Sequence, residues 1–119
     1  EFTEHAAVDC DRIYGDKFTV NEEDVTGIGN NVVLEFGEFD FTQEQPSAIV
    51  VTGKSKLPMN SINILLSGDT NERIIIQFEG CGEYTERSFD LSGISGRCKV
   101  SLTFLPGSDF DLRSFRFVK

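Results

Sequence analysis

Few residues in the chain have the chemistry that hydrolysis requires. A hydrolytic triad needs a histidine to transfer the proton, and the single histidine, His5, lies near the start of the chain with no motif around it. Catalysis by paired carboxylates needs two acidic groups that face each other across a cleft. Most acidic residues here fall in turns or at the polar positions of alternating runs. The residue types therefore predict a chain with no catalytic activity of its own.

Binding of a sugar is a second chemistry that the residues allow. It needs an aromatic face that packs on the C–H surface of the sugar, with amides and carboxylates nearby to bind its hydroxyls. Because the chain has no Trp, that face must come from Tyr14, Tyr84 or a Phe in a loop. Tyr84 follows the loop 80–83, and Asn30 and Asn31 occupy another loop. These residues are candidates for a carbohydrate site, with the alternative that Tyr84 is a rim residue of the fold.

Calcium binding is a third possibility, since hard cations need several oxygen ligands from adjacent loops. Asp9 and Asp11 lie close together near the start of the chain, and Asp109 and Asp111 near its end. If the two ends of an antiparallel sandwich lie side by side, these carboxylates can meet and hold a structural calcium ion. The alternative is a set of separate solvated or turn-capping aspartates. No other cofactor is predicted.

The length and composition predict a single acidic domain over residues 1–119. Eleven Lys and Arg stand against twenty Asp and Glu, which gives a formal net charge of −9. Nucleic-acid binders neutralise phosphates with Lys and Arg, and anionic membranes attract basic segments, so neither partner is expected. At 119 residues the chain is too short for two independent cores.

The cysteines predict no metal cluster. Cys10, Cys81 and Cys98 are odd in number, and no pair has the C-x-x-C spacing of a zinc site. Three free thiols are therefore expected, with one disulfide and one orphan thiol as the alternative.

Alternation of apolar and polar residues dominates the chain and predicts an all-β fold. Runs of four to eight residues place their apolar side chains on one face, as half-buried strands do. Turn-forming residues separate the runs, including those at 27–30 and 80–82. This spacing is typical of a β-sandwich of two antiparallel sheets. The predicted strands are 18–20, 32–36, 39–41, 48–52, 61–66, 74–78, 85–91, 100–104 and 112–118.

Two breaks in the alternation predict β-bulges. Phe36 and Phe39 differ in parity, and Gly37 lies between them. Leu112 and Phe115 differ in the same way around Arg113 and Ser114. One extra residue at each place returns both apolar sets to the same core.

The order of these segments resembles family 6 carbohydrate-binding modules. The run from Gly29 to Phe36, with Phe39-Asp40-Phe41, resembles the "G-D-W-V-E-Y…V-D-F" segment of that family. The ending 107–117 is similar to "G-G-F-N-L-D-W-I-R-F" and is the most specific part of a likeness that covers about residues 14–118. More narrowly, residues 11–16, 28–31 and 104–108 look like a module attached to bacterial β-galactosidase-type enzymes of glycoside hydrolase family 2. The resemblance implies a jelly-roll β-sandwich of the galactose-binding type, carried as an accessory domain of a hydrolase.

The resemblance also assigns roles to single positions. Tyr84 matches the region of a sugar-stacking aromatic, and Asp111 falls where the family has an Asn that binds sugar hydroxyls. Arg113 occupies the position of an Asp associated with the structural calcium, and Ser114 that of a Trp. Arginine there would repel a cation.

Two functions follow from these observations. The first is a carbohydrate-binding module that holds a galactoside or plant polysaccharide near the catalytic domain of a larger hydrolase, from which the segment is an excised piece. The second is a degenerate domain of the same enzyme that binds no sugar and serves packing or oligomerisation. An aromatic-rimmed concavity favours the first, and an exposed apolar patch that docks on the parent enzyme favours the second.

Overall fold

The alternating runs form one antiparallel sheet in a computed structural model that describes residues 2–119. Each described strand pairs with at least one neighbour, and the sheet order is β2-β5-β8-β6-β9-β4-β3, with β1 added to β9 and β7 to β6. Among the described residues no helix has the length and apolar character to cross a bilayer. The elements are β1 (His5–Ala6), η1 (Ala7–Asp9), β2 (Arg12–Tyr14), β3 (Thr19–Val20), β4 (Val25–Ile28), β5 (Val32–Phe41), β6 (Ala48–Gly68), β7 (Glu72–Asp90), β8 (Gly96–Phe104) and β9 (Phe110–Val118).

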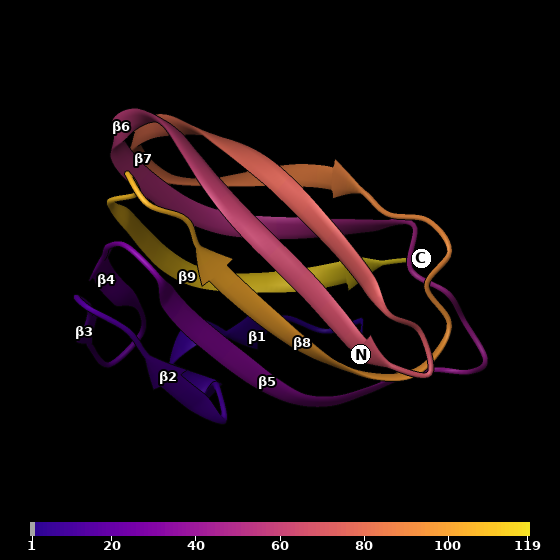
Figure 1. Cartoon of the computed structure of the whole chain (residues 1–119). Helices are drawn as coiled ribbons and strands as arrows, with labels where there is room; N and C mark the ends of the chain where they lie inside the picture. Colours follow the sequence, from indigo (N-terminus) through magenta and orange to yellow (C-terminus); the bar gives the residue numbers. More distant parts are fainter. Residues whose placement is uncertain (1) are drawn as a thin grey trace.

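The long hairpin of β6 and β7 folds this sheet into two layers. Residues 48–54 of β6 pair with β9, whereas residues 62–68 pair with β8. Strand β7 follows β6 through the same bend, so that one hairpin belongs to both layers. In Figure 1 both strands turn at the upper left, where β6 passes from the back layer of β9 to the front layer of β8, β5 and β2, and β7 passes back again. The predicted jelly-roll sandwich is confirmed, with its two sheets continuous at this corner.

Buried polar side chains hold the corner. The Ser55 hydroxyl donates to the carbonyl oxygen of Asp109 at 2.5 Å and accepts the N–H of Leu57 at 3.1 Å. The Asn60 side chain donates to the carbonyl of Phe78 at 3.4 Å and accepts the N–H of Asp109 at 3.2 Å. Ser55 and Asn60 are 5% and 1% exposed. Buried polar groups must be paired in this way, and here the pairing ties the bend to the start of β9.

Phenylalanine rings fill the space between the layers. Eight of the eleven Phe side chains are buried. Phe115 meets Phe36 at a centroid distance of 4.8 Å, and Phe110 meets Phe78 at 4.8 Å, both edge to face. This geometry is favourable for aromatic pairs, so the core joins β9 to both β5 and β7.

Both predicted bulges are confirmed. The pairing of β5 with β8 shifts register between Phe36 and Phe39. The pairing of β6 with β9 shifts between Thr52 and Gly53, opposite Ser114 and Leu112, which leaves Arg113 as the extra residue. Phe39 and Phe115 thereby return to the core.

The turn predicted at 80–82 was wrong, and the turn predicted at 27–30 was wrong in part. Residues 80–82 lie inside β7, because the strand bends there instead of ending. The predicted turn 27–30 overlaps β4, which ends at Ile28. The predicted strands 48–52 and 61–66 are likewise parts of β6. The three cysteines are free thiols.

The corner network predicts the effect of removing Asn60. Asn60→Ala should lower the free energy of unfolding by about 1–3 kcal/mol, because the N–H of Asp109 and the carbonyl of Phe78 lose their partner in a buried place. Urea unfolding followed by circular dichroism measures the change. Asn63→Ala is the matched control, since the Asn63 side-chain oxygen is buried without a partner, and it should stay within about 0.5 kcal/mol of the parent. Equal losses in both variants would contradict the role of the corner.

Candidate functional site

One row of residues crosses four strands on the outer face of the back layer. Gly53 pairs with Thr85, and the register of β6 with β7 shifts directly after this pair. The Lys54 side chain there extends over the Tyr84 ring. Lys54 in turn pairs with Asp111 of β9. Asp111 Oδ1 accepts the N–H of Gly27 in β4 at 3.0 Å. The sheet register therefore brings an aromatic ring, an ammonium group and a carboxylate into one line.

Arg113 joins this row because of the bulge in β9. The extra residue has no partner on β6 and its side chain is exposed. Its guanidinium carbon lies 4.3 Å from the centroid of the Tyr84 ring. The Lys54 ammonium lies 5.0 Å from the same centroid. Two cations therefore lie within cation–π distance of one ring.

The hydroxyl of Tyr84 is hydrogen-bonded to a carboxylate. It donates to Asp24 Oδ2 at 2.5 Å, and the side-chain amide of Asn21 donates to Asp24 Oδ1 at 2.9 Å. Asp24 directly precedes β4, so this contact links β7 across the sheet to the loop after β3. We call Asp24, Lys54, Tyr84, Asp111 and Arg113 the Tyr84 cluster.

The ionisation states of the cluster follow from these contacts. Partial burial, followed by the hydrogen bond to Asp24, raises the pKa of Tyr84 well above its ordinary value. The hydrogen bond from Tyr84 lowers the pKa of Asp24, assisted by Asn21 and by the charges of Arg113 and Lys54. At neutral pH the phenol is therefore neutral and Asp24 is ionised.

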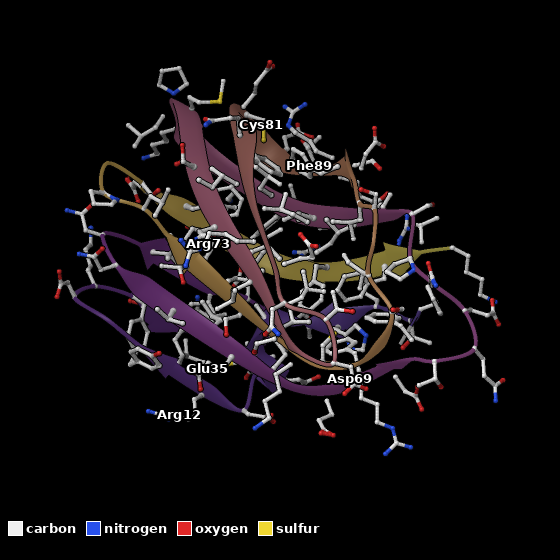
Figure 2. The ribbon with its side chains drawn as sticks, turned by 45° about the vertical axis from the view of Figure 1, so that its right-hand side comes forward. Arg12, Glu35, Asp69, Arg73, Cys81 and Phe89 are labelled. Atoms are coloured by element: carbon white, nitrogen blue, oxygen red, sulfur yellow. The ribbon has the colours of Figure 1, made fainter. Side chains whose placement is uncertain are left out.

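Two hollows flank the cluster. Arg113 and Ser114 form part of the first, which lies against the N-terminal segment, and the second lies beside the corner of β6 and β7. Figure 2 shows Cys81, which lines the second hollow, at that corner. The first is lined by Glu4, Ala6, Val8, Asp9, Glu22, Glu23, Arg113 and Ser114, and the second by Ser55, Lys56, Leu57, Pro58, Gly80, Cys81 and Gly82.

The arrangement suits recognition of a polar ligand. The Tyr84 ring supplies an apolar surface, the two cations donate hydrogen bonds, and the two carboxylates accept them. The single histidine takes no part, because the His5 ring packs on Phe39 and Phe115 at centroid distances of 4.7 and 5.4 Å.

The structure joins two of the four predicted carbohydrate residues. Tyr84 and Asp111 share the cluster, and the charge of Asp111 contributes to the raised pKa of Tyr84. Asn30 instead accepts the N–H of Gly107 through its side-chain oxygen at 2.8 Å. Asn31 is a turn residue with φ of 58°. Asn30 thus holds the connection between β4 and β5 against the loop before β9, and the Asn31 N–H donates to the carbonyl of Phe104 at the end of β8, at 2.8 Å.

The predicted calcium ligands do not come together. Asp9 lines the first hollow, Asp11 lies beside Gly37, and the backbone of Asp109 is bound at the corner. Within residues 2–119 no group of three or more His, Cys, Asp or Glu side chains is arranged to hold a metal ion. Asp9, Asp11 and Asp109 thus have three different surroundings, and calcium binding stays a prediction from the sequence.

Sequence reasoning missed Lys54 and Asp24 as parts of the site, and it gave Arg113 only as a residue that would repel calcium. Lys54 lies two residues after the predicted strand 48–52, but its position beside the Tyr84 ring depends on a register shift that alternation alone does not give. Asp24 lies in a turn sixty residues from Tyr84, and no local pattern signals that contact.

The cluster predicts how Asp24 titrates. Its pKa lies below the ordinary value of 3.8, so the ionised form stabilises the fold above that pH, and this stabilisation is lost as the pH falls through the lowered pKa. Tyr84→Phe removes the largest cause and should raise the pKa of Asp24. Carbon-detected NMR of the side-chain carboxyl groups measures it. Asp40 is the internal control, since its lowered pKa comes mainly from Thr42 and should not change. A pKa of Asp24 that does not rise in Tyr84→Phe would contradict the assignment.

Comparison with known proteins supports the fold. No protein-family model matches the sequence, and no curated protein sequence matches it. The structure of CsCBM6-3 from Clostridium stercorarium in complex with cellobiose matches with a TM-score of 0.84 and 18% identity, over 99% of this chain and 94% of that one. A family 6 carbohydrate-binding module from Clostridium cellulolyticum in complex with xylose matches with a TM-score of 0.83 and 23% identity, over 99% and 98%.

A larger protein contains the same fold as one part. A family 43 arabinoxylan arabinofuranohydrolase from Bacillus subtilis, in complex with cellotetraose, matches with a TM-score of 0.80 and 20% identity. The match covers 99% of this chain and 27% of that enzyme. At these identities the similarity establishes architecture. The chain has the fold of family 6 carbohydrate-binding modules.

Proposed function

We propose that the chain is a non-catalytic carbohydrate-binding module whose sugar contacts the Tyr84 cluster. The observation that carries this proposal is the ring of Tyr84 itself, half-buried on the outer face and surrounded by two cations and two carboxylates. The fold supports it, because two of the similar structures described above are modules solved with a sugar. Fold alone does not assign a function, so the side chains are the main support.

The cluster offers each contact that a pyranose ring needs. The C–H face of the sugar packs on the Tyr84 ring once the Arg113 guanidinium moves from over it. Arg113 is exposed and lies on a bulge, so its side chain is free to reorient. Asp24 and Asp111 accept hydroxyl hydrogens, and Lys54 donates to ring or hydroxyl oxygens.

The first ligands to test are β-linked glucose and xylose oligosaccharides. Cellobiose, xylose and cellotetraose are the sugars in the three similar structures. A galactoside stays a narrower prediction from the sequence resemblance. No nucleic acid or membrane partner is proposed.

The proposed setting is a larger glycoside hydrolase. A bound module raises the concentration of its polysaccharide near the catalytic domain through the linkage between them. The arabinofuranohydrolase that contains this fold in 27% of its chain supports that setting. A β-galactosidase-type parent is the more specific form of this proposal and rests on the sequence resemblance.

Two observations favour the second function, a structural domain without a ligand. Arg113 and Lys54 cover the ring that a sugar would use. On the outer face of the front layer, Ile75 and Tyr14 are 56% and 43% exposed. Register places Asn63, Thr103 and Val33 between them, and such a surface can dock on a neighbouring domain.

Substitution of Tyr84 separates the two functions. Tyr84→Ala should weaken binding of the best oligosaccharide at least about tenfold, or ~1.4 kcal/mol, because the packing face is lost. Isothermal titration calorimetry measures the affinity after a glycan array selects the ligand.

Tyr14→Ala is the matched control. Tyr14 is the other tyrosine of the chain, and its hydroxyl also donates to a carboxylate, Glu35 Oε2, at 3.0 Å. Affinity should be unchanged in this variant. Absence of binding to any glycan on the array, or equal affinities in the parent and Tyr84→Ala, would support the structural function instead.

A further inference from the structure

The two tyrosines of the chain share one arrangement, in which the hydroxyl donates to a carboxylate and an arginine lies over the ring. At Tyr14, the hydroxyl donates to Glu35 and the Arg12 guanidinium lies 5.2 Å from the ring centroid. Arg12 also forms an ion pair with Glu35, with Nη1 and Oε1 3.8 Å apart. Figure 2 shows Arg12 and Glu35 next to each other at the lower edge of the molecule. Cation, ring and carboxylate therefore form a closed triangle in which the charge of Arg12 is neutralised.

At Tyr84 the triangle is open. The hydroxyl donates to Asp24, and Arg113 lies nearer to its ring, at 4.3 Å. In the part of the chain that the structure describes, however, no ion pair joins Arg113 or Lys54 to a carboxylate. Four other cationic side chains, Arg12, Arg97, Arg116 and Lys119, do have such partners.

Four of the eleven basic side chains form ion pairs within residues 2–119, so the lack of one at Arg113 and Lys54 matters only because both cations lie close to the same ring. Two cations close to one ring repel each other, and nearby carboxylates would ordinarily be recruited to them. Asp24 and Asp111 instead accept hydrogen bonds from the Tyr84 hydroxyl and the Gly27 N–H. The cluster is thus left with two donors that lack a direct anionic partner.

We infer that Arg113 and Lys54 select an acidic sugar, so that the ligand of the Tyr84 cluster carries a carboxylate, as a uronic acid does. This inference rests on the proposed carbohydrate function. The guanidinium fork matches a planar carboxylate with two parallel hydrogen bonds. When Arg113 turns from the ring to that carboxylate, it also uncovers the Tyr84 face, and Lys54 supplies a second positive charge.

Arg113 has the opposite effect on a neutral sugar. Such a ligand must displace the guanidinium from the ring and offers no anion in return. The cation–π contact is then lost without replacement. Arg113 therefore favours acidic over neutral glycans in two ways. It binds the carboxylate of an acidic glycan, and it covers the Tyr84 ring when the glycan is neutral.

The test uses one oligosaccharide in two forms. Xylotriose substituted with glucuronic acid is compared with its methyl ester, which has the same skeleton without the charge. Calorimetry on the full chain should show the acid bound about tenfold or more tightly than the ester. Arg113→Gln should weaken the acid about tenfold and leave the ester unchanged or tighter. Lys54→Gln should weaken the acid to a smaller extent.

Arg12→Gln is the matched control, because it removes the same charge from the other tyrosine. Affinity for both forms should change by less than about twofold, since the exposed charge is distant and screened. Circular dichroism melting confirms that each variant is folded. Equal weakening by Arg12→Gln and Arg113→Gln would overturn the inference.

The remaining outcomes separate the inference from the proposed function. Equal, Tyr84-dependent affinities for acid and ester would overturn the acidic preference and leave the carbohydrate function in place. Binding of neither form, with no ligand on a wider array, would overturn both.

Discussion

The bend of the β6–β7 hairpin is the constraint on which the rest of the structure depends. The hairpin can serve both layers only if its two strands pass very close to their neighbours at the corner. A Cβ at Gly80 would lie 2.0 Å from the Leu57 carbonyl oxygen, and one at Gly53 would lie 2.2 Å from the Phe110 ring. Glycine at both places permits this approach, and the buried pairing of Ser55 and Asn60 satisfies the polar groups that the bend exposes.

The position of the Tyr84 cluster follows from that corner. Strand β6 pairs with β9 as far as Lys54 and then bends away. Lys54 therefore lies next to the start of β9 and next to the part of β7 that follows its own bend. The bulge then adds Arg113 on the outer face without disturbing Leu112 and Phe115 in the core. The sheet thus presents the charged side chains, and the bulge places one of them, Arg113, at an exposed position. This combination suits a module that binds a ligand without transforming it.

The sequence predicted what local patterns determine. Alternation gave the all-β class, and the parity breaks at Gly37 and Arg113 located both bulges correctly. The bend of β7 at the corner was not predicted, because glycines within 80–82 are as typical of a turn as of a bent strand. The same limit applies to the site. Tyr84 and Asp111 were found, but Lys54 and Asp24 reach them through register and tertiary contact. Asn30, Asn31 and the carboxylates assigned to calcium had suitable chemistry and lie elsewhere, since residue type carries no information on distance.

The most direct test of the account is the location of the bound sugar. Backbone amide NMR spectra of the ¹⁵N-labelled chain, recorded during titration with the oligosaccharide that binds best, show which residues contact it. The shifts should be concentrated at 24–27, 53–54, 82–86 and 111–113, the segments that form and support the Tyr84 cluster. Shifts confined to the front layer around Tyr14 and Ile75, with none at Tyr84, would contradict it.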